Sequence, residues 1–95
     1  MMAKMNRKPA FLTQLRNALI DDLAKAGIRA RVEVEPVPTT RLHRVFVLAP
    51  EFAALKHSER QNLVWRIADR VLDPDQQLLI SMIITLTPNE AKGAA

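Results

Sequence analysis

The side chains that most often carry out catalysis are few in this chain and lie far apart in the sequence. Two histidines, His43 and His57, stand on different predicted elements, with no carboxylate at a recognisable spacing from either. Cysteine is absent, and the two glycines are too few for a phosphate-binding loop. Ser58 is placed to cap a helix and Ser81 lies inside an apolar run, so neither has a neighbouring base. These observations predict a protein that is not an enzyme.

Basic residues offer a different chemistry, the binding of phosphates or of an acidic protein surface. The net charge is +4, which attracts such partners over long range but also serves solubility. Arg66 and Arg70 are four residues apart, hence on one face of a helix, and Arg44 lies on a predicted hairpin. A basic helix beside a basic hairpin would suit nucleic acid. Acidic residues interrupt this charge and rings for base stacking are scarce, so we rank nucleic-acid recognition below protein binding.

Two further positions are candidates for contact with a partner. Trp65 lies at the edge of the apolar face of its predicted helix, where it covers the rim of the core or anchors a partner; the core role is favoured. Arg60 stands near the start of the same helix, and we weight partner binding equally with an ordinary solvated or ion-paired role. The candidate binding residues are therefore Arg44, Arg60, Trp65, Arg66 and Arg70.

Hydrophobic periodicity predicts the elements that would position these side chains. Apolar residues recur at three- and four-residue spacing, which predicts a helix over Pro9–Ala26 that Gly27 terminates. Residues 28–35 alternate between apolar and charged, as a half-buried strand does. A loop rich in proline and threonine follows, and residues 42–48 form a second strand. Because the connection is short, these two strands should pair antiparallel.

A second helix and a third strand complete the chain. Ser58 and Gln61 have the spacing of a capping box at the start of the helix, and Asp73-Pro74 ends it. Residues 52–56 are expected to form a short separate turn. The nearly continuous apolar run over 78–84 predicts a strand that is central or covered on both faces. Residues 1–8 and 91–95 are predicted to be flexible tails.

The order of elements predicts an α+β fold of α-β-β-α-β type, with a three-stranded mixed sheet and helices packed on one face. A right-handed crossover makes the second and third strands parallel. The whole fits a single domain over residues 9–90. No apolar run has the length of a bilayer span and the amino end lacks the apolar core of a signal peptide, so we expect a cytoplasmic protein.

Three stretches in the carboxyl-terminal half have the order and spacing of a known family. They are an apolar strand over 44–49, the run Arg60-Gln61-Asn62-Leu63-Val64-Trp65 eight residues after Phe52, and Leu86-Thr87-Pro88 followed by Glu90. Together they resemble the BolA family of small adaptor and regulator proteins, over residues 44–90. The family fold is similar to a class II KH domain, which implies the same α-β-β-α-β order.

The resemblance also implies a partner and a cofactor. Family members share an iron–sulfur cluster with a monothiol glutaredoxin through a histidine near the start of the final strand. That position is Leu79 here, and Gln61 replaces the middle histidine of the helix signature. The resemblance thus implies a glutaredoxin-type partner, no cofactor bound by this chain alone, and a shared [2Fe-2S] cluster only if His43 or His57 replaces the missing ligand.

We therefore expect a non-enzymatic adaptor or regulator that binds a partner protein. One alternative is a nucleic-acid-binding regulator that uses the basic helix and hairpin. Salt separates these two, because phosphate contacts weaken steeply as salt rises and apolar protein contacts change little. The other alternative is a small structural subunit of a larger assembly, which an exposed apolar patch around Trp65 would favour.

Overall fold

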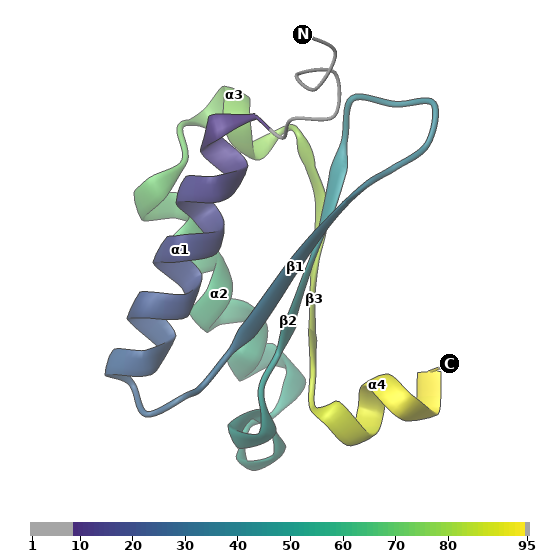
Figure 1. The fold of residues 1–95 in the computed structure, drawn as a ribbon. Helices are drawn as coiled ribbons and strands as arrows, with labels where there is room; N and C mark the ends of the chain where they lie inside the picture. The colour runs from purple at the N-terminus through teal and green to yellow at the C-terminus, as the bar shows by residue number, and fades with distance from the viewer. Residues whose placement is uncertain (1–8, 95) are drawn as a thin grey trace, which may run out of the picture.

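The computed structural model describes residues 9–94 and shows an α+β fold built on a three-stranded mixed sheet (Figure 1). The predicted α-β-β-α-β order is confirmed, and short helical segments are added to it. The predicted tail over residues 1–8 lies outside the described residues. The elements in chain order are α1 (Ala10–Lys25), β1 (Arg31–Pro36), β2 (His43–Leu48), the 3₁₀ helix η2 (Pro50–Ala54), α2 (His57–Val71), α3 (Pro74–Gln77), β3 (Ile80–Leu86) and α4 (Pro88–Ala94).

Helix α1 forms where the apolar stripe predicts it, within a residue at each end. The helix is capped at Ala26, and Gly27 follows with a φ of 81°, a left-handed conformation that favours glycine. The N–H of Ile28 then donates to the carbonyl of Leu23 at 2.8 Å and turns the chain toward β1. The stripe is fully buried against the sheet and consists of Leu12, Leu15, Leu19 and Leu23.

The pairing of the strands follows the prediction. β1 and β2 are antiparallel, with Val32 opposite Val47 and Val34 opposite Val45. β2 and β3 are parallel, with Val45 opposite Ile83. All five side chains are buried and belong to the main core, so one face of the sheet is mainly apolar. Alternation along each strand therefore sends the remaining side chains to the opposite face.

The position of β3 differs from the prediction. The strand order is β1-β2-β3, so β3 is an edge strand and is neither central nor covered on both faces. Its apolar run is nearly continuous because both faces of this strand carry apolar residues. Ile83 is buried under the helices, whereas Met82 on the other face is 47% exposed and Ile84 and Leu86 are half-buried. Periodicity alone could not separate this case from a central strand.

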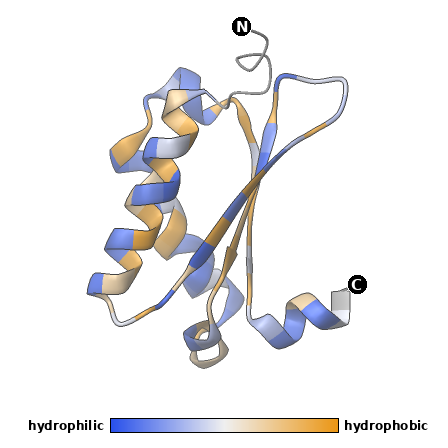
Figure 2. Ribbon diagram, in the orientation of Figure 1, coloured by the Kyte–Doolittle hydropathy of each residue, from blue (hydrophilic) through white to orange (hydrophobic). Residues whose placement is uncertain are grey.

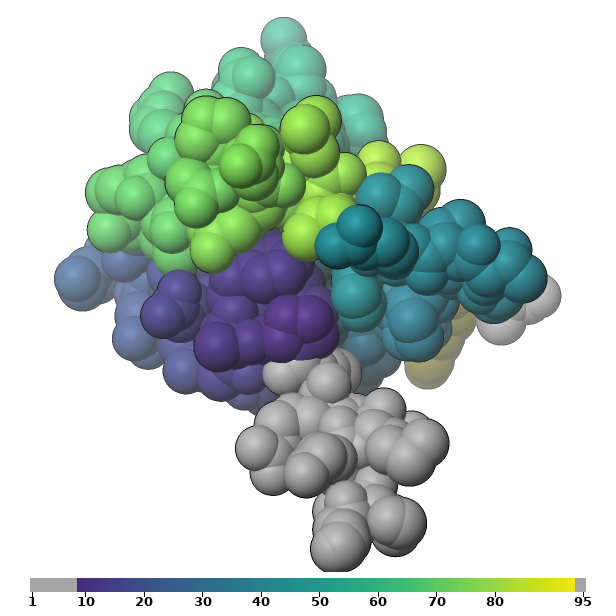
Figure 3. All heavy atoms as spheres, turned by 90° about the horizontal axis from the view of Figure 1, so that it is seen from above, coloured from purple at the N-terminus to yellow at the C-terminus, as the bar shows by residue number. Residues whose placement is uncertain are grey.

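Helices α1 and α2 cover one face of the sheet, and the other face is open along most of its length (Figure 1). Apolar residues of the helices and strands meet between these two layers (Figure 2). Seen from above, the loop between β1 and β2 projects from the body on the side away from α1 (Figure 3). Among residues 9–94, none of the helices has the length and apolar character that spanning a bilayer requires.

Two predicted boundaries were wrong. Helix α2 begins at His57, before Ser58, and the N–H of Lys56 donates to the Glu59 carboxylate at 2.8 Å, so Ser58 and Gln61 do not form its cap. The carboxyl-terminal residues 91–94, predicted to be a tail, belong to α4. A Thr-x-x-Glu capping box at Thr87 starts that helix, and this signal was present in the sequence.

Candidate functional site

Arg60 is a buried cation that joins three elements of the fold. Its side chain leaves the first turns of α2 and is 9% exposed. The guanidinium donates to Glu90 on α4 at 2.8 and 3.3 Å, to the carbonyl of Leu55 at 3.3 Å and to the carbonyl of Thr85 on β3 at 3.5 Å. It also lies 5.7 Å from the centre of the Phe52 ring, a cation–π distance. Its donors are thus engaged inside the molecule.

The partner carboxylate, Glu90, is fixed by the capping box of α4. The N–H of Thr87 donates to Glu90 Oε1 at 2.9 Å, and the N–H of Glu90 donates to Thr87 Oγ1 at 3.1 Å. The hydrogen bonds from Arg60, and then that from the Thr87 amide, lower the pKa of Glu90 to about 2. Glu90 therefore stays ionised over the whole ordinary pH range and holds α4 against Arg60.

The features that suggested the family resemblance thus contact one another. Phe52, Arg60 and Glu90 are far apart in the sequence and lie in one network of stacking, hydrogen bonds and an ion pair. The network positions α2, β3 and α4 relative to one another. For Arg60 it favours the ion-paired role over contact with a partner.

Gln61 also reaches β3, a role that sequence reasoning missed. Its Nε2 donates to the carbonyl of Ile83 at 2.9 Å and to Thr85 Oγ1 at 3.3 Å. The side chain is half-buried between helix and strand. No local signal predicts this contact, because it depends on how α2 lies across the edge of the sheet.

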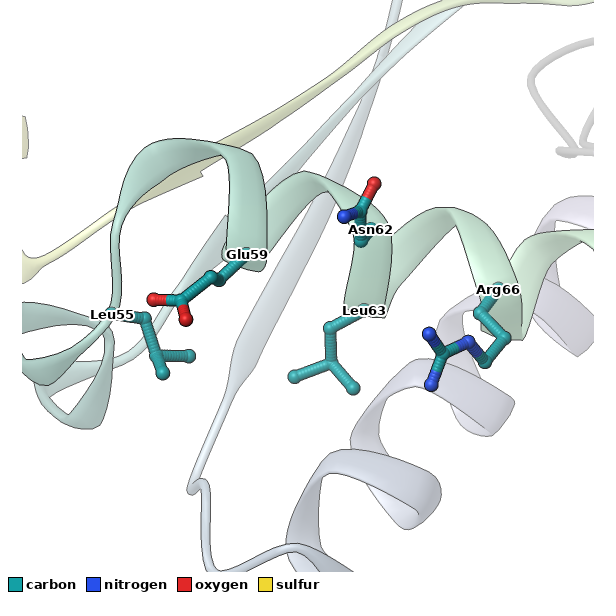
Figure 4. A pocket seen from close by; sticks show the side chains of 5 residues that line it. All are labelled: Leu55, Glu59, Asn62, Leu63 and Arg66. Carbon is teal, nitrogen blue, oxygen red and sulfur yellow. The ribbon is translucent and has the colours of Figure 1, made fainter.

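Arg66 is the candidate residue whose charge remains available to a partner. It is exposed and forms no ion pair with the residues that the structure describes. It lines a shallow pocket of about 250 Å³ on the outer side of α2, together with Leu55, Glu59, Asn62 and Leu63. In Figure 4 the side chains of Leu55, Leu63 and Arg66 point to the same side of the helix, whereas Asn62 points away. The pocket therefore joins apolar surface to one cation and one carboxylate; we call it the α2 groove.

The other two candidates on α2 are engaged with the fold. Arg70 forms an ion pair with Asp22 of α1, which ties the two helices together, although its side chain remains 61% exposed. Trp65 is half-buried and packs against the core. The large apolar side chains that are exposed among residues 9–94 are Leu78 and Met82. The exposed apolar patch around Trp65 that would favour a structural subunit is therefore not seen in this part of the chain.

Arg44 lies on the opposite side of the sheet from α2. Its strand neighbour Val45 faces the helices, and Arg44 itself pairs across the strands with Glu35, at 4.0 Å. The structure therefore does not bring Arg44 together with Arg66 and Arg70.

The BolA-like resemblance places a cluster-ligating histidine at the position of Leu79, so the question is whether His43 or His57 lies near that residue. The N–H of His43 donates to the carbonyl of Leu79 at 2.9 Å, and the register of the strands places His43 opposite Ile80, the residue after Leu79. His57 lies on the first turn of α2, at the other end of the molecule from the start of β3 (Figure 1). Within the described residues, the Nδ1 atom of His43 is buried and has no hydrogen-bond partner. Of the two histidines, His43 is therefore the one whose main chain lies beside Leu79. No cluster of three or more ligating side chains occurs in the described part of the chain.

Comparisons of this chain with protein-family profiles, with curated proteins and with solved structures found no match.

Proposed function

We propose that this protein is a non-enzymatic adaptor of BolA-like type that binds a partner protein through the α2 groove. The groove carries the proposal, because it places the apolar surface of Leu55 and Leu63 beside the charge of Arg66, which forms no ion pair within residues 9–94. Protein interfaces combine an apolar centre with charges at the rim in this way. The convergence of Phe52, Arg60 and Glu90 supports the resemblance on which the partner class depends. The proposed location is the cytoplasm.

The partner class that the resemblance implies is a monothiol glutaredoxin. A complementary surface would present an apolar side chain to the groove and a carboxylate to Arg66. If a [2Fe-2S] cluster is shared, His43 would supply this chain's ligand, since its main chain is hydrogen-bonded to that of Leu79. The cluster would provide electron transfer and a metal bond between the proteins. This chain would contribute one imidazole and a rigid surface.

The test is calorimetric titration of the protein into a monothiol glutaredoxin, first without and then with its [2Fe-2S] cluster, under anaerobic conditions. Visible circular dichroism recorded in parallel reports any change of cluster ligand. The proposal expects binding that Arg66→Glu weakens about tenfold or more. The matched control is Arg41→Glu, the same charge reversal on an exposed loop residue, which should leave binding unchanged. Absence of binding to both forms would contradict the proposed partner.

Nucleic-acid binding receives less support, because Arg44 and Arg66 lie on opposite sides of the sheet. The salt dependence of binding to a short duplex and a single strand tests this alternative. A steep loss of affinity with salt, together with a loss in Arg66→Glu, would favour it over the adaptor.

A further inference from the structure

The two edges of the sheet are protected in different ways. β1 carries alternating charges and ends in Pro36, both of which discourage the addition of another strand. β3 has neither device, since its seven residues include no charge and no proline. An uncharged apolar edge strand is the kind that pairs with other chains, so another feature must protect it.

The backbone groups that face the free edge of β3 follow from its pairing with β2. The N–H of Ala49 donates to the carbonyl of Leu86, so that carbonyl points toward β2. Successive backbone groups along a strand point to opposite sides, hence those of Ile83 and Thr85 point away from β2. These two residues present the donors and acceptors that an added strand would use.

Side chains of α2 occupy these acceptors. Gln61 Nε2 donates to the carbonyl of Ile83 at 2.9 Å, and Arg60 Nη1 reaches the carbonyl of Thr85 at 3.5 Å. Toward the start of the strand, an irregularity in the register after His43 leaves Ser81 with no residue directly opposite it, although its hydroxyl donates to the carbonyl of His43. This irregularity interrupts regular pairing there. We propose that the free edge of β3 is a surface for self-association with a second copy of this chain, and that α2 holds it closed through Gln61.

A second copy fits this edge in an antiparallel arrangement centred on Ile84. Ile83 would then lie opposite Thr85 of the second copy, and the two such pairs would exchange four main-chain hydrogen bonds. On the open face, Ile84 would meet its own symmetry mate and Met82 would meet Leu86, so all cross-strand pairs there are apolar. No like charges oppose each other, because β3 has none. The inference goes beyond the proposed function, since the α2 groove plays no part in it.

The experiment compares the full chain with Gln61→Ala by sedimentation velocity from about 10 µM to about 1 mM, a range that resolves weak dimers. The wild-type protein should remain a monomer. When its edge opens, each copy gives up the hydrogen bonds of Gln61 to the Ile83 carbonyl and to Thr85 Oγ1, together with the longer contact of Arg60 with the Thr85 carbonyl. The Arg60 contact is the same in both proteins, so removing Gln61 from both copies should lower the dimer dissociation constant about 30-fold or more. In the variant at high concentration, the exchange of the Ile83 and Thr85 amides should slow, as paired amides do.

Two further variants control the result. Asn62→Ala, the exposed neighbour of Gln61, should remain a monomer. Adding Ile84→Lys to Gln61→Ala places two lysines opposite each other and should abolish the dimer. A monomeric Gln61→Ala protein with unchanged amide exchange, or a dimer that persists with Ile84→Lys, would overturn the proposal. Circular dichroism and thermal melting establish that each variant is folded.

Discussion

Replacing Arg60 with methionine tests whether this residue is structural. Methionine keeps an apolar stem of similar length next to Phe52 but removes every donor. The carbonyls of Leu55 and Thr85 then lose their side-chain partner, and each such hydrogen bond contributes about 0.5–1.5 kcal/mol. The free energy of unfolding should fall by about 1–3 kcal/mol, which for a domain of this size lowers Tm by about 5–20 °C. The pair with half-exposed Glu90 is screened by water and is left out of this figure.

Urea denaturation measures the loss, with the emission of Trp65 and far-ultraviolet circular dichroism as two independent signals. Arg66→Met is the matched control, because it makes the same substitution in the same helix at an exposed site. It should change the stability by less than about 0.5 kcal/mol. The reasoning is refuted if Arg60→Met is as stable as the wild type, or if both variants lose equally.

Three further predictions follow from single residues. The pKa of Glu90 is lowered from 4.5 to about 2 in the folded protein, so the ionised carboxylate stabilises the fold fully above pH 5 and progressively less as the pH falls toward 2. The Tm of Glu90→Gln should therefore fall less than that of the wild type over this pH range. Phe52→Ala empties a fully buried site and should cost about 3–5 kcal/mol, measured as a shift of the urea midpoint. Gly27→Ala should destabilise the fold by about 1 kcal/mol through backbone strain alone, since the φ there is 81° and no atom lies close to an added Cβ. Gly93→Ala should be neutral or stabilising in the same melting assay, because alanine favours a helix more than glycine does and α4 also has room for the Cβ.

The sequence predicted the elements whose apolar pattern has a single interpretation. The leucine stripe of α1 and the alternation in β1 each match one period, and a short loop or a crossover helix then determines how the strands pair. The position of β3 could not be predicted, because apolar residues on its open face give the same pattern as a central strand. Helix α4 could have been predicted from the capping box formed by Thr87 and Glu90.

The sequence pointed to residues of the candidate site, but it did not predict what these residues do in the fold. Arg60 was identified from its position in the helix signature, yet its burial depends on Leu55, Thr85 and Glu90, which meet only in the folded chain. The function of Gln61 at the strand edge depends in the same way on the placement of α2 over β3. Arg44 and Arg66 were grouped by charge, and the sheet between them separates them.

The placement of Trp65 makes this protein suitable for time-resolved optical work without labels. The chain has one tryptophan and no tyrosine, so near-ultraviolet emission comes from one position. That position lies on α2, the crossover between β2 and β3, and packs against the core. Parallel pairing of β2 and β3 requires this crossover to close a long stretch of chain, which is a slow type of contact. Stopped-flow fluorescence would therefore follow the docking of the crossover, whereas far-ultraviolet circular dichroism would follow the helices, and a delay between the two signals would order the steps of folding.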